Sequence, residues 1–452
     1  MKKYDSYKDS EIEWIGEIPS HWKKIKFSYI TNLMTCGHAS TPEYVEEGGI
    51  PFLSAQNIKN EKLDLTVLKQ VPISLHESLI KNKKVEKGDL LQVRVGGADT
   101  IGQTAIVDLD FDFSIYVSLA HIKLNELAFN GYVKHLCNSL EFKEFCGVLM
   151  KKGAGVANLN VSDVASMLIP LPSLNEQISI ANYLDQKTSH IDDLIGKKER
   201  LIQLLKEERT AIINQAVTKG LDPTVPMKDS CIECLGEIPA HWEVKKLKQI
   251  FNSSKGLTIT KENLESEGIP CVNYGEIHSK FGFEVDIDQH QLKCVNPTYL
   301  ESDYKSLIQT GDFVFADTSE DVSGAGNFTY LKSNHEIFAG YHTIILRALC
   351  NIESRYFAYQ FDSIPYRTQI RQSVKGIKVF SVTQGILKNT SLWIPPLDEQ
   401  KQIIEFLDTE IERIVRLKKS TIKEIELLKE YKTALISEVV TGKVDVRNEK
   451  LS

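Results

Sequence analysis

The chain has 452 residues, of which 42% are hydrophobic and 25% are charged. This length predicts two or three domains, and the composition is typical of a globular protein. No run approaches the roughly 20 consecutive apolar residues of a membrane span, so we expect no association with a membrane. The net charge of −7 excludes a generally basic nucleic-acid coat protein, because phosphate neutralisation supplies most non-specific affinity. Eight cysteines without a framework pattern indicate reduced thiols and a cytoplasmic protein.

The two halves of the sequence repeat one another. The first copy opens with KDSEIEWIGEIPSHW and the second with KDSCIECLGEIPAHW, ending at Trp22 and Trp242. The copies close with PSLNEQISIANYLD and PLDEQKQIIEFLD. Between these segments the alignment pairs His121 with His342. We therefore expect a tandem repeat with a shared frame and different interiors.

Each copy begins with a body of mixed α/β character, at 1–172 and 220–395. Short β-branched runs such as Leu90–Val95 and Thr343–Leu346 are separated by Gly, Pro and Asn, which is typical of strands joined by turns. A helical stretch is expected over Gly131–Leu149. The predicted fold class is therefore α+β.

A long helix is expected after each body, over 173–219 and 396–443, and a tail of 444–452 remains. Ser173 and Glu176 have the spacing of a capping box at the start of the first helix. Apolar residues recur with heptad spacing in both segments, which favours pairing of the helices as a coiled coil. The seam consists of Leu184, Ile191, Ile195, Ile202, Leu205, Ile212, Leu407, Ile414, Ile425, Leu428, Leu435 and Val439. The alternative is a surface helix that lies on its own domain.

No catalytic motif stands out in the sequence. It has no G-x-x-x-x-G-K-[ST] phosphate loop. Its single Pro-Pro pair has Ile394 where the loop of an adenine methyltransferase needs a polar side chain. Cys231 and Cys234 have the spacing of zinc ligands, but no second pair follows at a workable distance. We therefore expect neither a catalytic residue nor a bound metal on this chain.

Two tryptophan–histidine pairs close the repeated openings. Trp22 and Trp242 each follow a proline by three residues and are expected to anchor the core of their body. His21 and His241 stand beside them, and a packed or hydrogen-bonded histidine is the favoured interpretation over a catalytic one.

Taken together, the repeated segments resemble the specificity subunits of type I restriction–modification enzymes over essentially the whole chain. Besides the two openings and the two helix starts, the resemblance rests on GDLLQVRVGGADTIGQTAI, FADTSEDVSGAGN and FAGYHTIILR. Each piece alone is weak. Their order and their repetition make the resemblance specific.

The resemblance implies two target-recognition domains that alternate with two long helices. The helices would pair antiparallel and give the repeat a pseudo-two-fold symmetry. Each domain would read one half of a bipartite site in double-stranded DNA, with the helices setting the gap. The subunit would have no catalysis or cofactor of its own. Two methyltransferase subunits would bring S-adenosylmethionine, and two motor-nuclease subunits would use ATP and Mg²⁺.

The resemblance also points to two loops and two turns as the DNA contacts. Arg and Gln suit guanine and adenine edges, Asp and Glu accept from cytosine, and lysines suit phosphates. For each lysine the alternative is a solvated surface charge, and for Arg94 it is a structural pair. The candidates are Arg94, Gln103, Thr104, Lys151, Lys152 and Asn158 in the first body, and Asp317, Ser319, Glu320, Asn327, Arg371, Lys375 and Lys378 in the second.

Two other functions fit the same sequence. The chain could be a coiled-coil adaptor whose bodies bind protein, or the specificity module of another restriction system. The net charge of −7 suggests that methyltransferase subunits supply much of the contact with phosphates, so the isolated chain should bind DNA weakly.

Overall fold

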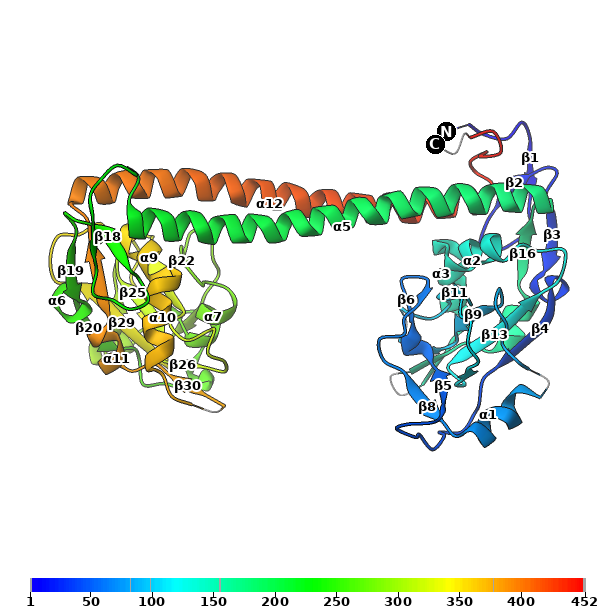
Figure 1. The fold of residues 1–452 in the computed structure, drawn as a ribbon, viewed down its shortest axis with the longest axis horizontal. Helices are drawn as coiled ribbons and strands as arrows, with labels where there is room; N and C mark the ends of the chain where they lie inside the picture. Colours follow the sequence, from blue (N-terminus) through cyan, green and yellow to red (C-terminus); the bar gives the residue numbers. More distant parts are fainter. Residues whose placement is uncertain (1, 82, 98, 154–155, 377, 450–452) are drawn as a thin grey trace. The chain divides into compact units, whose positions relative to one another are not determined.

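The computed structural model describes the chain except residues 1, 82, 98, 154–155, 377 and 450–452, and the side chains of 151–153 and 156. The chain forms two compact units (Figure 1). Unit 1 comprises Met1–Glu199 and Ile422–Ser452, and unit 2 comprises Arg200–Thr421. Each unit therefore combines one body with part of each long helix.

The body of unit 1 contains two main sheets. The larger has strand order β11-β9-β13-β4, all antiparallel, and the smaller has order β12-β5-β8, with β12 parallel to β5. Their strands are β4 (Thr31–Cys36), β5 (Ile50–Leu53), β8 (Lys69–Val71), β9 (Leu90–Val93), β11 (Thr104–Ile106), β12 (Ser114–Ile115) and β13 (Leu119–Leu124). Short ribbons are formed by β1 (Tyr7–Asp9), β2 (Glu17–Pro19), β3 (Lys23–Lys26), β6 (Ile58–Lys59), β7 (Lys62–Leu63), β10 (Val95–Gly96), β14 (Lys151–Gly153), β15 (Val156–Asn158) and β16 (Leu168–Leu171).

The body of unit 2 repeats this plan with more strands. Its sheets have the orders β20-β29-β25-β27-β22 and β23-β21-β28-β24. Their strands are β20 (Phe251–Lys255), β21 (Ile269–Val272), β22 (Glu284–Val285), β23 (Lys293–Val295), β24 (Leu307–Ile308), β25 (Phe313–Ala316), β27 (Phe328–Leu331), β28 (Ile337–Ala339) and β29 (Thr343–Ala348). Its ribbons are formed by β17 (Met227–Asp229), β18 (Glu237–Pro239), β19 (Glu243–Lys246), β26 (Thr318–Ser319), β30 (Phe380–Ser381) and β31 (Ser391–Ile394).

Short helices cover the sheets of both bodies. The predicted helix over Gly131–Leu149 is two helices, because Ser139 ends the first and caps the second by accepting from the Phe142 N–H. Ser363 makes the same break in unit 2. The short helices are α1 (Ile73–Ile80), α2 (Asn130–Asn138), α3 (Leu140–Leu149) and α4 (Val161–Ser166) in unit 1, and α6 (Leu247–Ile250), α7 (Tyr274–Ser279), α8 (Tyr299–Ser302), α9 (Ser354–Asp362), α10 (Ile364–Ser373) and α11 (Gln384–Asn389) in unit 2.

Strand register shows which residues of the two bodies are equivalent. In unit 1 His121 lies opposite Leu91, and in unit 2 Ile345 lies opposite Val314 at the matching positions of the sheet. The equivalent of His121 is therefore Ile345. The sequence alignment that paired His121 with His342 was wrong by three residues, because loops of different length separate the strands in the two copies.

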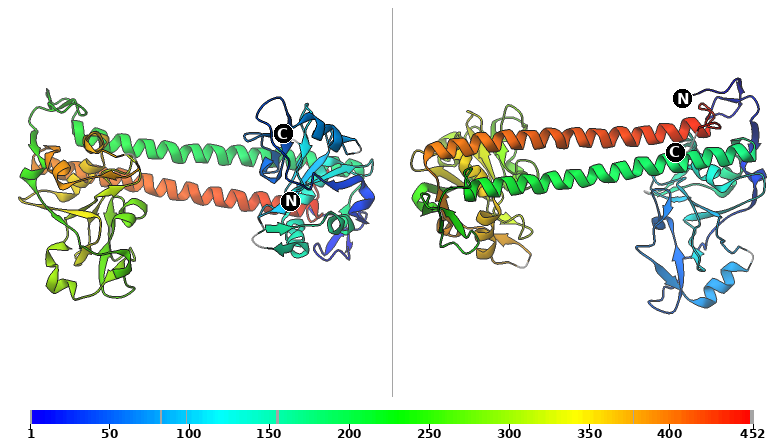
Figure 2. Two further views of the ribbon diagram at one scale, coloured as in Figure 1. Left: turned by 90° about the horizontal axis from the view of Figure 1, so that it is seen from below. Right: turned by 45° about the horizontal axis from the view of Figure 1, so that its top comes forward.

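The two long helices are α5 (Leu174–Lys219) and α12 (Leu397–Val440). They run antiparallel within each unit (Figure 2). In unit 1 Asp192 bonds to Lys432 at 2.8 Å, whereas Lys198, further along α5, pairs with the earlier Glu424. In unit 2 Glu208 bonds to Arg413 at 2.6 Å. The predicted α+β fold with paired antiparallel helices is confirmed.

The heptad seam lies on the inner side of these helices. All twelve predicted seam residues are buried or half-buried, with Leu184, Leu407 and Val439 completely buried. Gly220 and Gly442 follow the helices with left-handed φ values of +72° and +78°. Glycine adopts this conformation at little cost, so it suits the end of a helix.

A tryptophan–glutamate joint fixes each body to the start of its helix. The indole N–H of the fully buried Trp22 donates to Glu176 at 3.0 Å, and His21 Nε2 lies 3.0 Å from the same carboxylate. Trp242, His241 and Glu399 repeat this arrangement at 3.0 and 2.7 Å. The predicted core role of both tryptophans is confirmed.

The capping box predicted at Ser173 and Glu176 is only half right. The Ser173 hydroxyl accepts from the Glu176 backbone N–H at 3.4 Å, as a cap should. The Glu176 carboxylate, however, bonds to Trp22 and His21 instead of returning to the backbone of the cap. The acidic residue therefore ties the body to the helix.

A second acidic residue joins each body to its helix with different partners in the two units. In unit 1 Asp185 of α5 bonds to His135 and Lys134 of α2 at 2.8 and 2.7 Å. In unit 2 Asp408 of α12 bonds to Arg355 of α9 at 2.8 Å and to the Tyr359 hydroxyl. The position of the acid is shared, although its partners are not.

Among the described residues, no helix combines the length and apolarity that crossing a bilayer requires.

Replacing Glu176 with Leu should destabilise unit 1 by about 1–3 kcal/mol, because the buried Trp22 indole N–H loses its acceptor. The measurement is chemical denaturation followed by circular dichroism. Glu199→Leu, at an exposed position of the same helix, is the control and should change the midpoint little. An equal effect of both substitutions would contradict the role of the joint.

Unit 1 should lose stability between pH 7 and pH 5. Burial lowers the pKa of His135 from 6.5, so the unfolded chain takes up a proton that the folded unit rejects, which costs about 1.4 kcal/mol per pH unit. Burial would raise the pKa of Asp185, but its bonds to His135 and Lys134 lower it to about 2, so Asp185 stays charged across this range.

The measurement is the protection of α2 against hydrogen exchange as a function of pH, corrected for the intrinsic effect of pH on exchange. The corresponding helix of unit 2, α9, is the reference. His135→Tyr, which copies Tyr359 of unit 2, should flatten the pH dependence of α2. The same loss of protection in the variant would show that other groups are responsible.

Candidate DNA interface

A small three-stranded ribbon projects the first group of candidate residues. In it β10 pairs with β15, and β15 pairs with β14. Arg94 directly precedes β10 and donates from Nη2 to Asn158 Oδ1 of β15 at 2.8 Å. Its Nη1 and Nε donate to the backbone carbonyls of Val117 and Leu159 at 2.9 and 3.1 Å. Arg94 therefore braces the ribbon against the body and holds Asn158 in place.

Unit 2 carries a ribbon at the same place in its fold. There β26 pairs with β30, and Thr318 lies opposite Ser381 just as Val95 lies opposite Asn158 in unit 1. Asp317 consequently takes the position of Arg94. The backbones of the two ribbons pair in the same way at these positions. Their side chains differ in charge and in hydrogen-bonding capacity.

The other candidates of unit 1 are divided between its surface and its interior. Gln103 is half-buried and its amide lies 3.5 Å from the Asp99 carbonyl. Thr104 is completely buried, and its hydroxyl donates to the Gly102 carbonyl and accepts from Gln92. The backbone of Lys151 and Lys152 forms β14, and the side chains of both lie outside the described part of the structure.

Asp317 and Asn327 of unit 2 are held by a hydrogen-bond network. Asp317 bonds to the Thr318 hydroxyl and to His342 Nδ1 at 2.7 and 3.1 Å. Asn327 accepts from Arg367 at 2.6 Å and bonds to His278 Nδ1 at 2.9 Å. The network fixes the orientation of both candidate side chains.

The remaining candidates of unit 2 surround this network. Ser319 is buried and donates to the Asp321 carbonyl at 2.7 Å, whereas Glu320 is exposed. Arg371 donates to the Ser323 carbonyl at 2.6 Å, and burial lowers the pKa of its guanidinium. Lys375 and Lys378 are exposed on the segment that leads to β30. Exposed Glu320, Lys375 and Lys378 are thus free to meet a ligand in solution.

His278 and Arg367 belong to this surface although the sequence did not single them out. His278 on α7 bonds through Nε2 to the Thr318 carbonyl at 2.8 Å, which leaves Nδ1 to accept from Asn327. Arg367 of α10 bridges Asn327 and Asp362. Both are at least 40 positions from the residues they support, Thr318 and Asn327, so no local pattern could have revealed them.

No metal centre accompanies these ribbons: the described ranges contain no group of three His, Cys, Asp or Glu side chains that could hold a metal ion. The candidate surface consists of amide, carboxylate, guanidinium and ammonium groups, which suits hydrogen bonding to base edges and phosphates.

Comparison with known families agrees with the double architecture. The type I restriction modification DNA specificity domain matches residues 19–204 and again residues 239–427. Together these matches cover most of the chain. The chain belongs to this specificity family. It is a type I specificity subunit with two tandem recognition domains, and specificity subunits are non-catalytic components of their systems.

Curated relatives extend over nearly the same length. The type I restriction enzyme MjaIX specificity subunit of Methanocaldococcus jannaschii is 25% identical, with 96% of this chain and 95% of the relative covered. The EcoKI specificity subunit of Escherichia coli K12 is 24% identical, with 86% of this chain and 82% of the relative covered.

Solved structures support the fold. The HsdS subunit from Thermoanaerobacter tengcongensis matches with a TM-score of 0.56 at 16% identity, covering 94% of this chain and 98% of the other. A chain from a structure of type I restriction–modification complex assembly matches with a TM-score of 0.67 at 16% identity, covering 94% of this chain and 99% of the other.

Replacing Arg94 with Met should destabilise unit 1 by about 1–3 kcal/mol, because the carbonyls of Val117 and Leu159 lose their charged donor. Thermal unfolding measures the effect. Lys375→Met, at an exposed position, should leave the unfolding temperature unchanged. If the Arg94 variant unfolds at an unaltered temperature, the bracing role of Arg94 is contradicted. Its guanidinium would then be available to contact bases directly.

Proposed function

We propose that each body of this specificity subunit reads one half of a bipartite site in double-stranded DNA through its ribbon. The observation that carries the proposal is the pair of equivalent ribbons with unlike side chains. Arg94 and Asn158 of unit 1 stand where unit 2 has Asp317 and Ser381. A guanidinium and a carboxylate favour different base edges, so the two halves of the site would differ in sequence.

The bonds in and beside each ribbon assign different tasks to the candidate residues. The N–H groups of Arg94 already donate to Asn158 and to two backbone carbonyls. Asn158 and Gln103 are therefore the better candidates for contact with bases in unit 1. In unit 2 Asp317 and Asn327 are held in place by His342 and Arg367, which suits oriented contact with base edges. Exposed Lys375 and Lys378 suit phosphates.

The long helices would set the gap between half-sites and hold the partner subunits. Their 46 and 44 residues correspond to about 65–70 Å of continuous helix. Large apolar side chains on them remain exposed in each unit, and such patches mark sites of protein association. They are Leu174, Leu194, Ile422, Leu427 and Tyr431 in unit 1, and Leu201, Leu204, Leu397, Phe406, Val415 and Leu417 in unit 2.

The partners would be two methyltransferase subunits using S-adenosylmethionine and two motor-nuclease subunits using ATP and Mg²⁺. The shared frame supports two copies of one partner, because the same buried tryptophan–glutamate joint attaches the body to the helix in both units. The net charge of −7 supports the view that the methyltransferases supply part of the contact with phosphates. Such a complex acts on cellular DNA, so we place it in the cytoplasm.

The decisive experiment is a base-resolution map of adenine methylation in a naive host. The host expresses this chain together with the methyltransferase from the genome that encodes the chain. The control host expresses that methyltransferase alone. We expect a split motif, methylated on both strands, that depends on this chain.

Variants then separate the two halves of the motif. Asn158→Ser should change or abolish only one half of the site, and Asp317→Asn only the other. A co-purifying complex without any new motif would contradict DNA recognition and favour a protein-binding adaptor. Simultaneous loss of both halves from each single variant would contradict separate reading by the two bodies.

A further inference from the structure

Unit 1 contains a cavity at a place where unit 2 has a packed core. Three positions that are apolar in unit 2 are polar in unit 1. His121 corresponds to Ile345, and Ser114 corresponds to Phe338 through their pairing with β5 and β21. His38 corresponds to Leu257, because the strands β4 and β20 that lead to them keep matching registers. All three counterparts in unit 2 are almost completely buried.

These replacements surround a cavity of about 410 Å³ in unit 1. One part of its wall is apolar and includes Leu79, Ile80, Val85, Phe113 and Ile115. The other part is polar and includes His38, Ser78, Lys83, Ser114 and His121. A cavity of this size falls within the range of about 300–1,000 Å³ that is typical of sites for small molecules.

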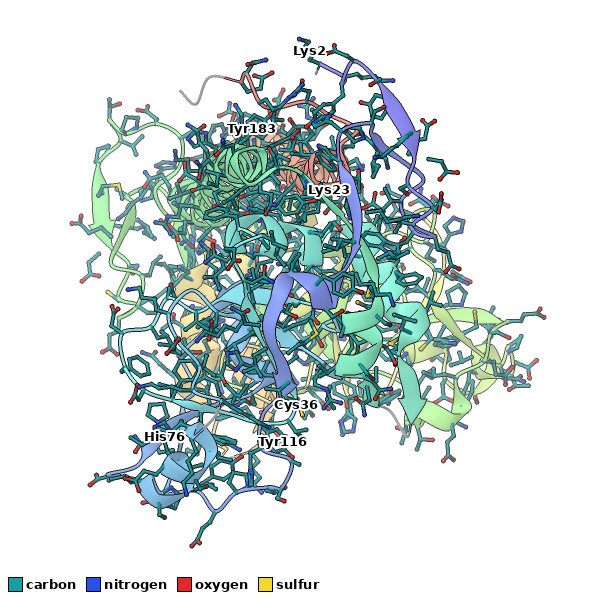
Figure 3. All side chains as sticks on the ribbon, turned by 90° about the vertical axis from the view of Figure 1, so that its right-hand side faces the viewer. Lys2, Lys23, Cys36, His76, Tyr116 and Tyr183 are labelled. Atoms are coloured by element: carbon teal, nitrogen blue, oxygen red, sulfur yellow. The ribbon has the colours of Figure 1, made fainter. Side chains whose placement is uncertain are left out.

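The cavity lies in the part of unit 1 that is far from the long helices. Figure 3 shows Cys36, His76 and Tyr116 together there, away from Tyr183 on α5. Cys36 lines the cavity, His38 bridges to Tyr116, and His76 bonds to the cavity residue Ser114 at 2.9 Å. The site is therefore separate from the helices and from the tryptophan–glutamate joint.

One ring nitrogen of His121, a residue that lines the cavity, lacks a partner. His121 is 1% exposed, and its Nε2 lies 2.7 Å from Asp89, which also accepts from the Glu86 backbone N–H. Since the carboxylate can only accept, Nε2 carries the hydrogen of this bond, and in the tautomer with a single N–H the other nitrogen, Nδ1, is an acceptor. No described residue donates to Nδ1. A buried polar atom without a partner is rare in proteins and calls for a ligand or water.

We propose that this cavity binds a nucleobase. A base offers N–H donors at its edge for His121 and a flat ring for the wall that includes Phe113 and Ile115. Lys83 is exposed at the cavity and suits an attached phosphate. A purely apolar ligand would leave the Nδ1 of His121 unpaired, at the cost of an unsatisfied buried acceptor.

The base can come from either of two sources, a free nucleoside phosphate or an unstacked base of bound DNA. Only the second source rests on the proposed function. The two hypotheses can therefore fail separately, because binding of a free nucleotide needs no sequence recognition.

The first arm of the test is calorimetric titration of the full chain with each of the four nucleoside 5′-monophosphates up to about 1 mM. The second arm follows the fluorescence of 2-aminopurine opposite an abasic site in a duplex. We expect saturable binding in at least one arm. Binding in the first arm alone identifies a free nucleotide as the ligand, and a signal in the second arm alone identifies a base of DNA.

Matched variants locate the ligand. His121→Ile, which copies unit 2, should weaken binding about tenfold or more, since the hydrogen bond to Nδ1 is lost. His38→Leu copies Leu257 and should weaken it about threefold without disturbing Asp89. His335→Gln, at an exposed position of unit 2, is the control and should bind as the unaltered chain does. No binding in either arm, or binding unchanged by both cavity variants, would overturn the proposal.

Discussion

A carboxylate that accepts a hydrogen bond from a buried indole is the interaction on which each half of the molecule depends. Glu176 and Glu399 lie in the first turn of their helices, where a negative charge is favoured by the helix dipole. Each receives the indole N–H of a completely buried tryptophan and sits beside a histidine. The opening of each repeat is thereby joined to its closing segment, and the body between them is held to a helix.

The side chains that hold each body to its helix differ less between the two units than the side chains of the ribbons do. The tryptophan–glutamate joint is identical in both units. The second acidic residue that joins body and helix has different partners, which include His135 in unit 1 and are Tyr359 and Arg355 in unit 2. The ribbons differ more strongly, because Asp317 replaces Arg94 on the same backbone. The tryptophan–glutamate joint is thus kept alike, while the side chains of the ribbons differ. This arrangement suits the proposed function, in which the two halves meet similar partners and different DNA sequences.

Periodicity and repetition made the architecture predictable from the sequence. The heptad seam was sufficient to predict both long helices, because its spacing is local and continuous. Long-range bonds were not predictable. The inward orientation of Arg94, the use of Glu176 by Trp22, and the support given by His278 and Arg367 all depend on residues far away in sequence. Because the loops of the two copies differ in length, the sequence alignment paired His121 with the wrong residue. Strand register in the structure was needed to find its counterpart.

The position of Trp22 and Glu176 also bears on how such a gene can evolve. The segment from Lys23 to Pro172, which is most of the first body, lies between these two residues. Recombination that exchanged this segment would leave the joint intact and deliver a complete new ribbon in one event. Point mutation, by contrast, would have to alter several bonded residues around Arg94 one at a time. New specificities would therefore arise more readily by shuffling whole bodies than by gradual change within one.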